Sequence, residues 1–198
     1  KKTSKEKAKS VSKTATADNT DVKVGVKKPS KRTVPPVKPK ILADNPEVIA
    51  DSNNIVEIKP KKSVLFVASE GLPFVKTGGL ADVIGSLPKA LAARKEYDVN
   101  VIMPMYSQID AGIRNNFTFV GNFNVGLSWR NLYCGLFSFR LDGVNYFFID
   151  NEYYFKRDRL YGEYDDGERF AFFSKAVLDS LGYMNFYPDV INCNDWQT

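Results

Sequence analysis

Two short apolar runs separated by one amphipathic segment place the strongest constraint on the fold of this chain. Residues 63–69 (SVLFVAS) and 98–104 (DVNVIMP) are rich in β-branched and other apolar side chains, which is typical of strands buried on both faces. Between them, residues 80–94 carry apolar side chains at intervals of three and four, which predicts an amphipathic helix. A strand, a helix and a strand in this order form a βαβ unit with parallel strands and a right-handed crossover. We therefore expect an α/β protein.

The rest of the chain continues this alternation. Further strands are expected at residues 117–127, 133–141, 144–149 and 189–193, and a further helix is expected at residues 167–181. Asp142-Gly143 is a typical hairpin turn, and residues 194–198 form a loop after the last strand. The pattern predicts a Rossmann-like, open and mainly parallel sheet with an inserted β-hairpin.

Residues 1–62 differ sharply in composition from the rest of the chain. They hold 16 of the 28 Lys and Arg residues and 7 of the 23 Asp and Glu residues, whereas residues 63–198 have more acidic than basic side chains. Every Phe, Tyr and Trp lies at or beyond Phe66. Such a segment cannot bury enough apolar surface to offset the entropy of ordering. We therefore expect a disordered, Lys- and Pro-rich tail and linker over residues 1–62 and one folded domain over residues 63–198.

The basic tail has two interpretations, a solvated tether or a segment that binds a polyanion. Its prolines favour an extended spacer. Arg32 is its one arginine, and it has no aromatic side chain to stack on a base. These features favour a tether over specific nucleic-acid or membrane binding, and they identify no partner for the tail.

The composition argues against a metal site and a membrane span. The chain has no histidine, and Cys134 and Cys193 have no metal-ligand spacing, so a zinc site of the usual kind is excluded and both thiols are expected to be buried. No apolar stretch approaches the roughly 18 residues that a membrane span needs. The start of the chain does not resemble a signal peptide. Because its first residue is Lys1 and not Met, the question whether a targeting segment precedes it stays open.

The turn between the first strand and the first helix contains two adjacent glycines and a lysine. Lys76, Gly78 and Gly79 stand just before the helix, at the end of a parallel strand where open α/β sheets bind ligands. Glycines let backbone N–H groups approach an anion, and the start of a helix supplies free donors. The turn matches neither the P-loop nor the dinucleotide-binding pattern. From these residues alone, a diphosphate site and a simple tight turn both remain possible.

A resemblance to a known family favours the diphosphate site over the simple tight turn. Residues 69–91 (SEGLPFVKTGGLADVIGSLPKAL) closely resemble the N-terminal signature of bacterial glycogen synthases and plant starch synthases. Residues 101–106 (VIMPMY), 160–164 (LYGEY) and 167–176 (GERFAFFSKA), followed by Asp195-Trp196, agree with that family in order. The resemblance implies the N-terminal domain of a GT-B fold, which has two facing Rossmann-like domains, with the chain ending before the catalytic unit is complete.

The resemblance also implies an activity and a set of site residues. The family transfers glucose from ADP-glucose to the non-reducing end of an α-1,4-glucan with retention of configuration. The residues implied to bind the donor are Lys76, Thr77, Gly78, Gly79, Asp82 and Glu70, and those implied in catalysis are Asp195 and Tyr164. No metal or other cofactor is implied, and the location is expected to be the cytoplasm or, in a plant, the plastid stroma.

Plainer interpretations remain for some of these residues. Asp82 is also a good helix-start residue, Glu70 could be a surface carboxylate, and Tyr164 could serve packing. The family usually has histidines around the aspartate, where this chain has Asn192, Cys193, Asn194 and Gln197. Asn and Gln do not titrate near neutral pH, so a proton-transfer role at those positions is in doubt.

Two other functions stay open at this point. A related GT-B enzyme could use UDP-glucose, and a non-catalytic protein could bind or organise glucan. Because a cleft enzyme of this kind needs groups from both domains, we expect the chain by itself to be inactive.

Overall fold

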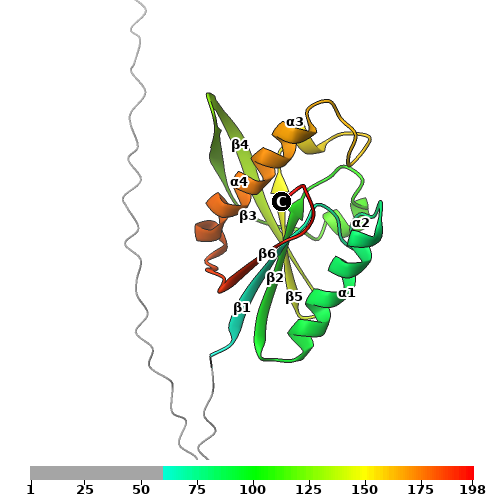
Figure 1. The fold of residues 1–198 in the computed structure, drawn as a ribbon, viewed down its shortest axis with the longest axis vertical. Helices are drawn as coiled ribbons and strands as arrows, with labels where there is room; N and C mark the ends of the chain where they lie inside the picture. Colours follow the sequence, from blue (N-terminus) through cyan, green and yellow to red (C-terminus); the bar gives the residue numbers. More distant parts are fainter. Residues whose placement is uncertain (1–59) are drawn as a thin grey trace, which may run out of the picture. The chain divides into compact units, whose positions relative to one another are not determined.

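The computed structural model describes residues 60–198 (Figure 1). The predicted tail lies outside the described residues except for positions 60–62, and Lys62 is already the first residue of a strand. The strands are β1 (Lys62–Val67), β2 (Tyr97–Pro104), β3 (Thr118–Leu127), β4 (Arg130–Leu141), β5 (Val144–Asp150) and β6 (Val190–Cys193). The helices are α1 (Gly79–Ala93), α2 (Ala111–Arg114), α3 (Glu152–Phe155) and α4 (Asp166–Met184).

Within residues 60–198 these strands form one sheet in the order β3-β4-β5-β2-β1-β6. The strands β5, β2, β1 and β6 pair in parallel, whereas β3, β4 and β5 pair antiparallel. The turn between β4 and β5 has positive φ at both Asp142 and Gly143, as a tight hairpin turn requires. The predicted mainly parallel sheet with an inserted hairpin is confirmed.

The parallel strands reverse their direction of winding between β1 and β6. The chain leaves β1, passes through α1 and adds β2 as one neighbour of β1. It later leaves β5, passes through α4 and adds β6 as the other neighbour of β1. Right-handed crossovers in opposite directions place their helices on opposite faces of the sheet, and Figure 1 shows α1 and α4 flanking the strands in this way. The carboxyl ends of β1 and β6 therefore border the crevice where such sheets bind ligands.

A buried phenylalanine fastens the segment after β1 to the core. Phe74 is almost fully buried, and its ring centroid lies 4.9 Å from that of Tyr146 and 5.0 Å from that of Phe148 on β5. It also contacts Phe117 and Phe139 edge-on. Because aromatic rings of this kind supply much of a core's buried surface, this segment is anchored rather than free.

Three details differ from the sequence expectation. The apolar stripes of the helices are wider than the surface they cover, so Val83, Leu87 and Leu178 are exposed. Cys134 is buried as expected, but Cys193 is exposed on β6 at the edge of the sheet. The short helices α2 and α3 were not predicted, because each is one turn long and shows no periodicity.

Candidate functional site

The chain segments that follow β1 and β6 meet at the carboxyl edge of the sheet. The backbone N–H of Asn194 donates to the carbonyl oxygen of Val67 at 3.1 Å, and the Asn194 side chain donates to the same oxygen at 3.0 Å. The glycine loop (residues 70–79) follows β1, and Asp195 follows β6. Both predicted groups therefore lie at the point where the strand order reverses, as ligand sites of this fold do.

Glu70 is buried under the glycine loop instead of lying on the surface. Its side chain is only 3% exposed. One carboxylate oxygen, Oε2, accepts hydrogen bonds from the backbone N–H of Thr77, from the Thr77 hydroxyl at 2.8 Å and from the Gly78 N–H at 3.3 Å. The alternative of a surface carboxylate is wrong, and the carboxylate holds the loop from inside.

Lys76 on the glycine loop forms an ion pair with Asp82 in the first turn of α1. The Lys76 ammonium lies 2.7 Å and 2.8 Å from the two Asp82 oxygens, and both side chains are about half exposed. Lys76 therefore has an ion-pair partner within this chain. Since exposed pairs of this kind contribute about 0–1 kcal/mol, a phosphate oxygen can displace the aspartate at little cost.

The tyrosine that contacts the residue just before the glycine loop is Tyr161 and not Tyr164. The hydroxyl of Tyr161 lies 2.7 Å from that of Ser69, at the end of β1, and its ring meets the Trp196 ring edge-on. Burial, together with the negative charge of Glu70, raises the pKa of Tyr161 to about 12, so the hydroxyl stays protonated at neutral pH. Tyr164 is fully exposed and has no hydrogen bond or ring contact within residues 60–198.

A buried arginine holds the segment that carries Tyr161. Arg169 on α4 is fully buried and donates to the carbonyl oxygens of Tyr154 at 2.8 Å and Leu160 at 3.2 Å. Its guanidinium also pairs with Asp166 at 2.5 Å. Sequence reasoning missed both Tyr161 and Arg169, although Gly162, which adopts a φ of +88°, marks the turn that separates Tyr161 from Tyr164.

Asp195 adopts a left-handed backbone conformation at the end of β6, with a φ of +69°. Its Oδ1 accepts a hydrogen bond from the Trp196 N–H at 2.8 Å, and the residue is exposed. Few non-glycine residues take this conformation, and those that do are often Asp or Asn near functional sites. The other carboxylate oxygen of Asp195 makes no hydrogen bond within residues 60–198.

Two amide side chains close to Asp195, those of Asn194 and Gln197, lie in different surroundings. Asn194 ties β6 to β1 through Val67, as described above. Gln197 is almost fully buried beside a hollow of about 200 Å³ that Phe170, Ser174 and Trp196 also line, and its Oε1 has no partner within residues 60–198. Neither side chain can exchange a proton near neutral pH.

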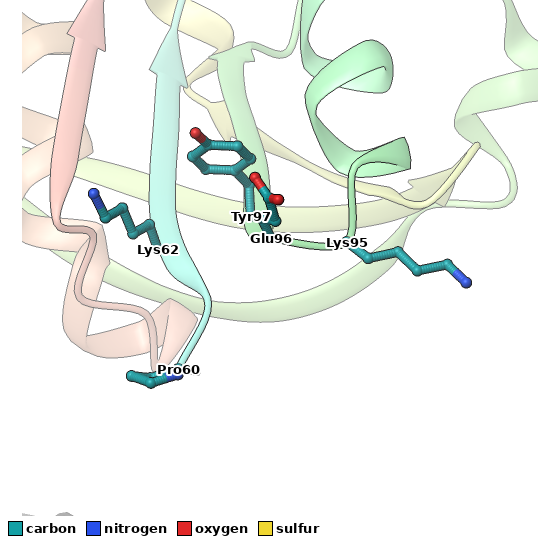
Figure 2. Close-up of a pocket in the computed structure, with 5 residues that line it drawn as sticks. All are labelled: Pro60, Lys62, Lys95, Glu96 and Tyr97. Atoms are coloured by element: carbon teal, nitrogen blue, oxygen red, sulfur yellow. The ribbon is translucent and has the colours of Figure 1, made fainter. Parts of the chain in front are cut away.

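A larger hollow of about 330 Å³ lies at the opposite end of the sheet, at the start of β1 and β2 (Figure 2). It is lined by Pro60, Lys62, Lys95, Glu96 and Tyr97. Figure 2 shows the Lys62 and Lys95 side chains pointing away from each other, so their charges do not converge on one ligand. Residues 60–198 also contain no group of three acidic or cysteine side chains that could hold a metal ion, and no helix among them is long and apolar enough to cross a membrane.

Comparisons with known proteins show to which family this chain belongs. The family model described as the starch synthase catalytic domain matches residues 63–198. The glycogen synthase of Clostridium kluyveri is 58% identical over 135 residues, and that of Clostridium botulinum is 56% identical over the same length. Each alignment covers 68% of this chain and 28% of the relative, so the chain spans about 28% of the length of these proteins.

A solved structure supports the same assignment. The catalytic domain of starch synthase IV from Arabidopsis thaliana, bound to ADP and acarbose, superposes with a TM-score of 0.64 at 31% sequence identity. The match covers 70% of this chain and 29% of that structure. The resemblance inferred from residues 69–91 is thus confirmed, and the chain belongs to the starch synthase catalytic domain family.

Proposed function

We propose that the complete protein containing this chain transfers glucose from ADP-glucose to the non-reducing end of an α-1,4-glucan, with retention of configuration. The observation that carries this proposal is the meeting of the glycine loop and Asp195 at the carboxyl ends of β1 and β6. The relatives named above are glycogen synthases, and the similar starch synthase structure was solved with ADP, which is the leaving group when ADP-glucose is the donor.

This chain would supply one wall of the donor site. Lys76 would exchange its contact with Asp82 for a contact with the diphosphate, adding a full positive charge to the partial charge at the start of α1. Asp195 would lie beside the transferred sugar, where a carboxylate can accept hydrogen bonds from hydroxyl groups or stabilise positive charge that develops at the anomeric carbon. Tyr161 would stay protonated and donate a hydrogen bond.

The rest of the donor site would come from the second domain of the fold. Because stabilising a leaving phosphate needs preorganised groups on both sides of the cleft, we expect residues 1–198 alone to show no transfer activity. The proposal involves no metal ion or other cofactor, so EDTA should leave the rate of the complete enzyme unchanged.

The direct test is a transfer assay on the complete protein with a glycogen primer. Radiolabelled ADP-glucose and UDP-glucose are compared as donors, and labelled polymer is measured. We expect incorporation from ADP-glucose that exceeds incorporation from UDP-glucose. A preference for UDP-glucose would assign the protein to the related enzymes that use UDP-glucose. Primer binding without glucose transfer from either donor would favour a non-catalytic glucan-binding protein.

A further inference from the structure

We propose that Glu70 is a positioning residue that shapes the glycine loop from inside, rather than a ligand of the donor. This inference deepens the proposed function and rests on it for its kinetic consequences. It also changes which backbone groups can bind the diphosphate, because the donors of Thr77 and Gly78 are already occupied.

The geometry shows a carboxylate used as an internal anchor. A single oxygen of Glu70 gathers three donors from two consecutive residues, the Thr77 N–H, the Thr77 hydroxyl and the Gly78 N–H. The side chain is nearly inaccessible to solvent. Burial of a carboxylate has to be offset by hydrogen bonds, and bonds from backbone N–H groups to a charged oxygen are among the stronger ones.

The loop is fixed at its other end as well. The Gly71 N–H donates to the carbonyl of Val75 and the Leu72 N–H donates to the carbonyl of Ala81, each at 3.1 Å. A Cβ on Gly71 would lie 2.6 Å from the Cγ2 of Ile84, and one on Gly85 would lie 2.8 Å from the Cβ of Leu72. The start of the loop, at Gly71 and Leu72, therefore packs against α1 without space to shift. Glu70 holds the end of the loop, at Thr77 and Gly78.

The anchor directs anion binding to the first turn of α1. The first N–H groups of a helix have no partner within the helix, and Gly78 at the N-cap provides no side-chain cap. With the Thr77 and Gly78 donors facing Glu70, the donors available to a diphosphate begin at Gly79. Lys76 lies on the same loop, so the position of its ammonium depends on the same anchor.

The test compares three substitutions of Glu70 in the complete enzyme. Glu70→Gln keeps an acceptor oxygen at the same reach without the charge, Glu70→Asp keeps the charge but shortens the reach, and Glu70→Ala removes both. If Glu70 acts as an anchor, Gln should retain more kcat/KM for ADP-glucose than Asp or Ala. The expected losses for Asp and Ala are about 10- to 100-fold. Glu96→Gln, at the far end of the sheet, is the matched control for removing one acidic charge.

A double-mutant cycle with Thr77→Val locates the partner. If Glu70 acts through Thr77, the combined loss of Glu70→Asp, which shortens the reach, and Thr77→Val should be smaller than the product of the single losses. Two outcomes would overturn the proposal. One is an Asp variant close to wild type with a Gln variant as poor as Ala, which would mean that the charge contacts the ligand. The other is independent, multiplying effects in the cycle.

Hydrogen exchange separates this proposal from the proposed function. In the ligand-free enzyme, the amides of residues 77 and 78 should exchange slowly in the wild type and in Glu96→Gln, and faster in Glu70→Ala. This readout needs no activity, so it tests the anchor even if ADP-glucose proves not to be the donor. It also needs only a folded protein, and Glu70→Asp, which shortens the reach of the carboxylate, takes the place of Glu70→Ala if that variant does not fold. If the amides of residues 77 and 78 exchange as fast in the wild type as in Glu70→Ala, the anchor is refuted.

Discussion

The two ends of the sheet offer different kinds of hollow, and the comparison shows what marks a functional site in this fold. The amino end has the larger cavity, about 330 Å³, with two lysines at its border. The carboxyl end has a smaller hollow beside Trp196 and Gln197 and one lysine that is already paired. Cavity size and local positive charge both favour the amino end, yet the strand order and the buried polar contacts favour the carboxyl end.

The difference lies in how the polar groups are held. At the carboxyl end, Glu70, Ser69 and Tyr161 are buried or half-buried and hydrogen-bonded, so their positions are fixed before a ligand arrives. At the amino end, Lys62 and Lys95 are exposed and diverge (Figure 2). Preorganised groups bind a transition state without a further cost of ordering, whereas flexible surface lysines do not.

The largest expected effect is the loss of kcat/KM on substitution of Lys76, with Lys62 at the other end of the sheet as the comparison. In the complete enzyme, Lys76→Ala should lower kcat/KM for ADP-glucose on the order of 10- to 150-fold, because a charge-assisted hydrogen bond contributes about 1.5–3 kcal/mol. Lys76→Arg should not restore it fully, because a planar guanidinium is wider than an ammonium. Lys62→Ala is the matched control and should stay within about twofold of wild type.

A thermal melt distinguishes a binding role of Lys76 from a structural one. The ion pair with Asp82 is half exposed, so its loss should lower stability by about 0–1 kcal/mol. Unchanged kinetics together with a clearly lowered Tm would mean that Lys76 is a structural residue. The main argument for placing the donor site at the carboxyl end of the sheet, rather than at the amino end, would then be removed.

A smaller effect is expected from the two tyrosines of residues 160–164. Tyr161→Phe removes one hydroxyl contact at the loop and should lower kcat/KM about 3- to 10-fold, the value of one neutral hydrogen bond. Tyr164→Phe should have no measurable effect, since that side chain is fully exposed.

The pH profile adds a second readout for Tyr161. Because burial raises its pKa to about 12, the hydroxyl does not titrate between pH 6 and about 9, and the profiles of wild type and Tyr161→Phe should have the same shape. A limb of the wild-type profile in that range that disappears in Tyr161→Phe would contradict this account, as would a larger loss in Tyr164→Phe than in Tyr161→Phe.

The smallest effect concerns stability at the amino end. Asp189 accepts hydrogen bonds from the Ser63 N–H at 2.7 Å and the Ser63 hydroxyl at 3.0 Å, joining the starts of β1 and β6. The backbone hydrogen bond from Ser63 lowers the pKa of Asp189. A lowered folded-state pKa stabilises the fold above the ordinary pKa near 3.9, and this contribution disappears as the pH falls through the folded-state value.

Asp189→Asn should therefore lower the Tm slightly at neutral pH, and its difference from wild type should shrink below about pH 4. Its kcat/KM should not change, because the contact lies away from the glycine loop. A difference in Tm that grows on acidification would refute the assigned role of Asp189, and a loss of activity at unchanged Tm would remove the contrast between the two ends.

The sequence predicted the sheet and the longer helices because their patterns repeat over several turns or residues. The one-turn helices α2 and α3 depend on single capping side chains, Asp110 and Asn151, which periodicity does not reveal. The position of the site was predictable, since the carboxyl ends of adjacent parallel strands must meet at one edge.

The contacts inside the site were less predictable. Nothing in the local pattern says that Glu70 turns inward to residues 77 and 78, or that Lys76 pairs with Asp82, because both contacts depend on how the loop folds back. The choice between Tyr161 and Tyr164 likewise depends on the buried Arg169 and on the turn at Gly162. The resemblance pointed to residues 160–164, and the structure shows that Tyr161 contacts Ser69 whereas Tyr164 is exposed.

The central claim is that the donor diphosphate binds at the glycine loop, at the carboxyl ends of β1 and β6. The most direct measurement is a crystal structure of the complete enzyme with ADP-glucose or ADP bound. The account predicts a phosphate oxygen within hydrogen-bond distance of the Lys76 ammonium and of the first N–H groups of α1, with Glu70 still bonded to Thr77. A nucleotide bound elsewhere, with Lys76 still paired to Asp82 and no ligand at the start of α1, would contradict it.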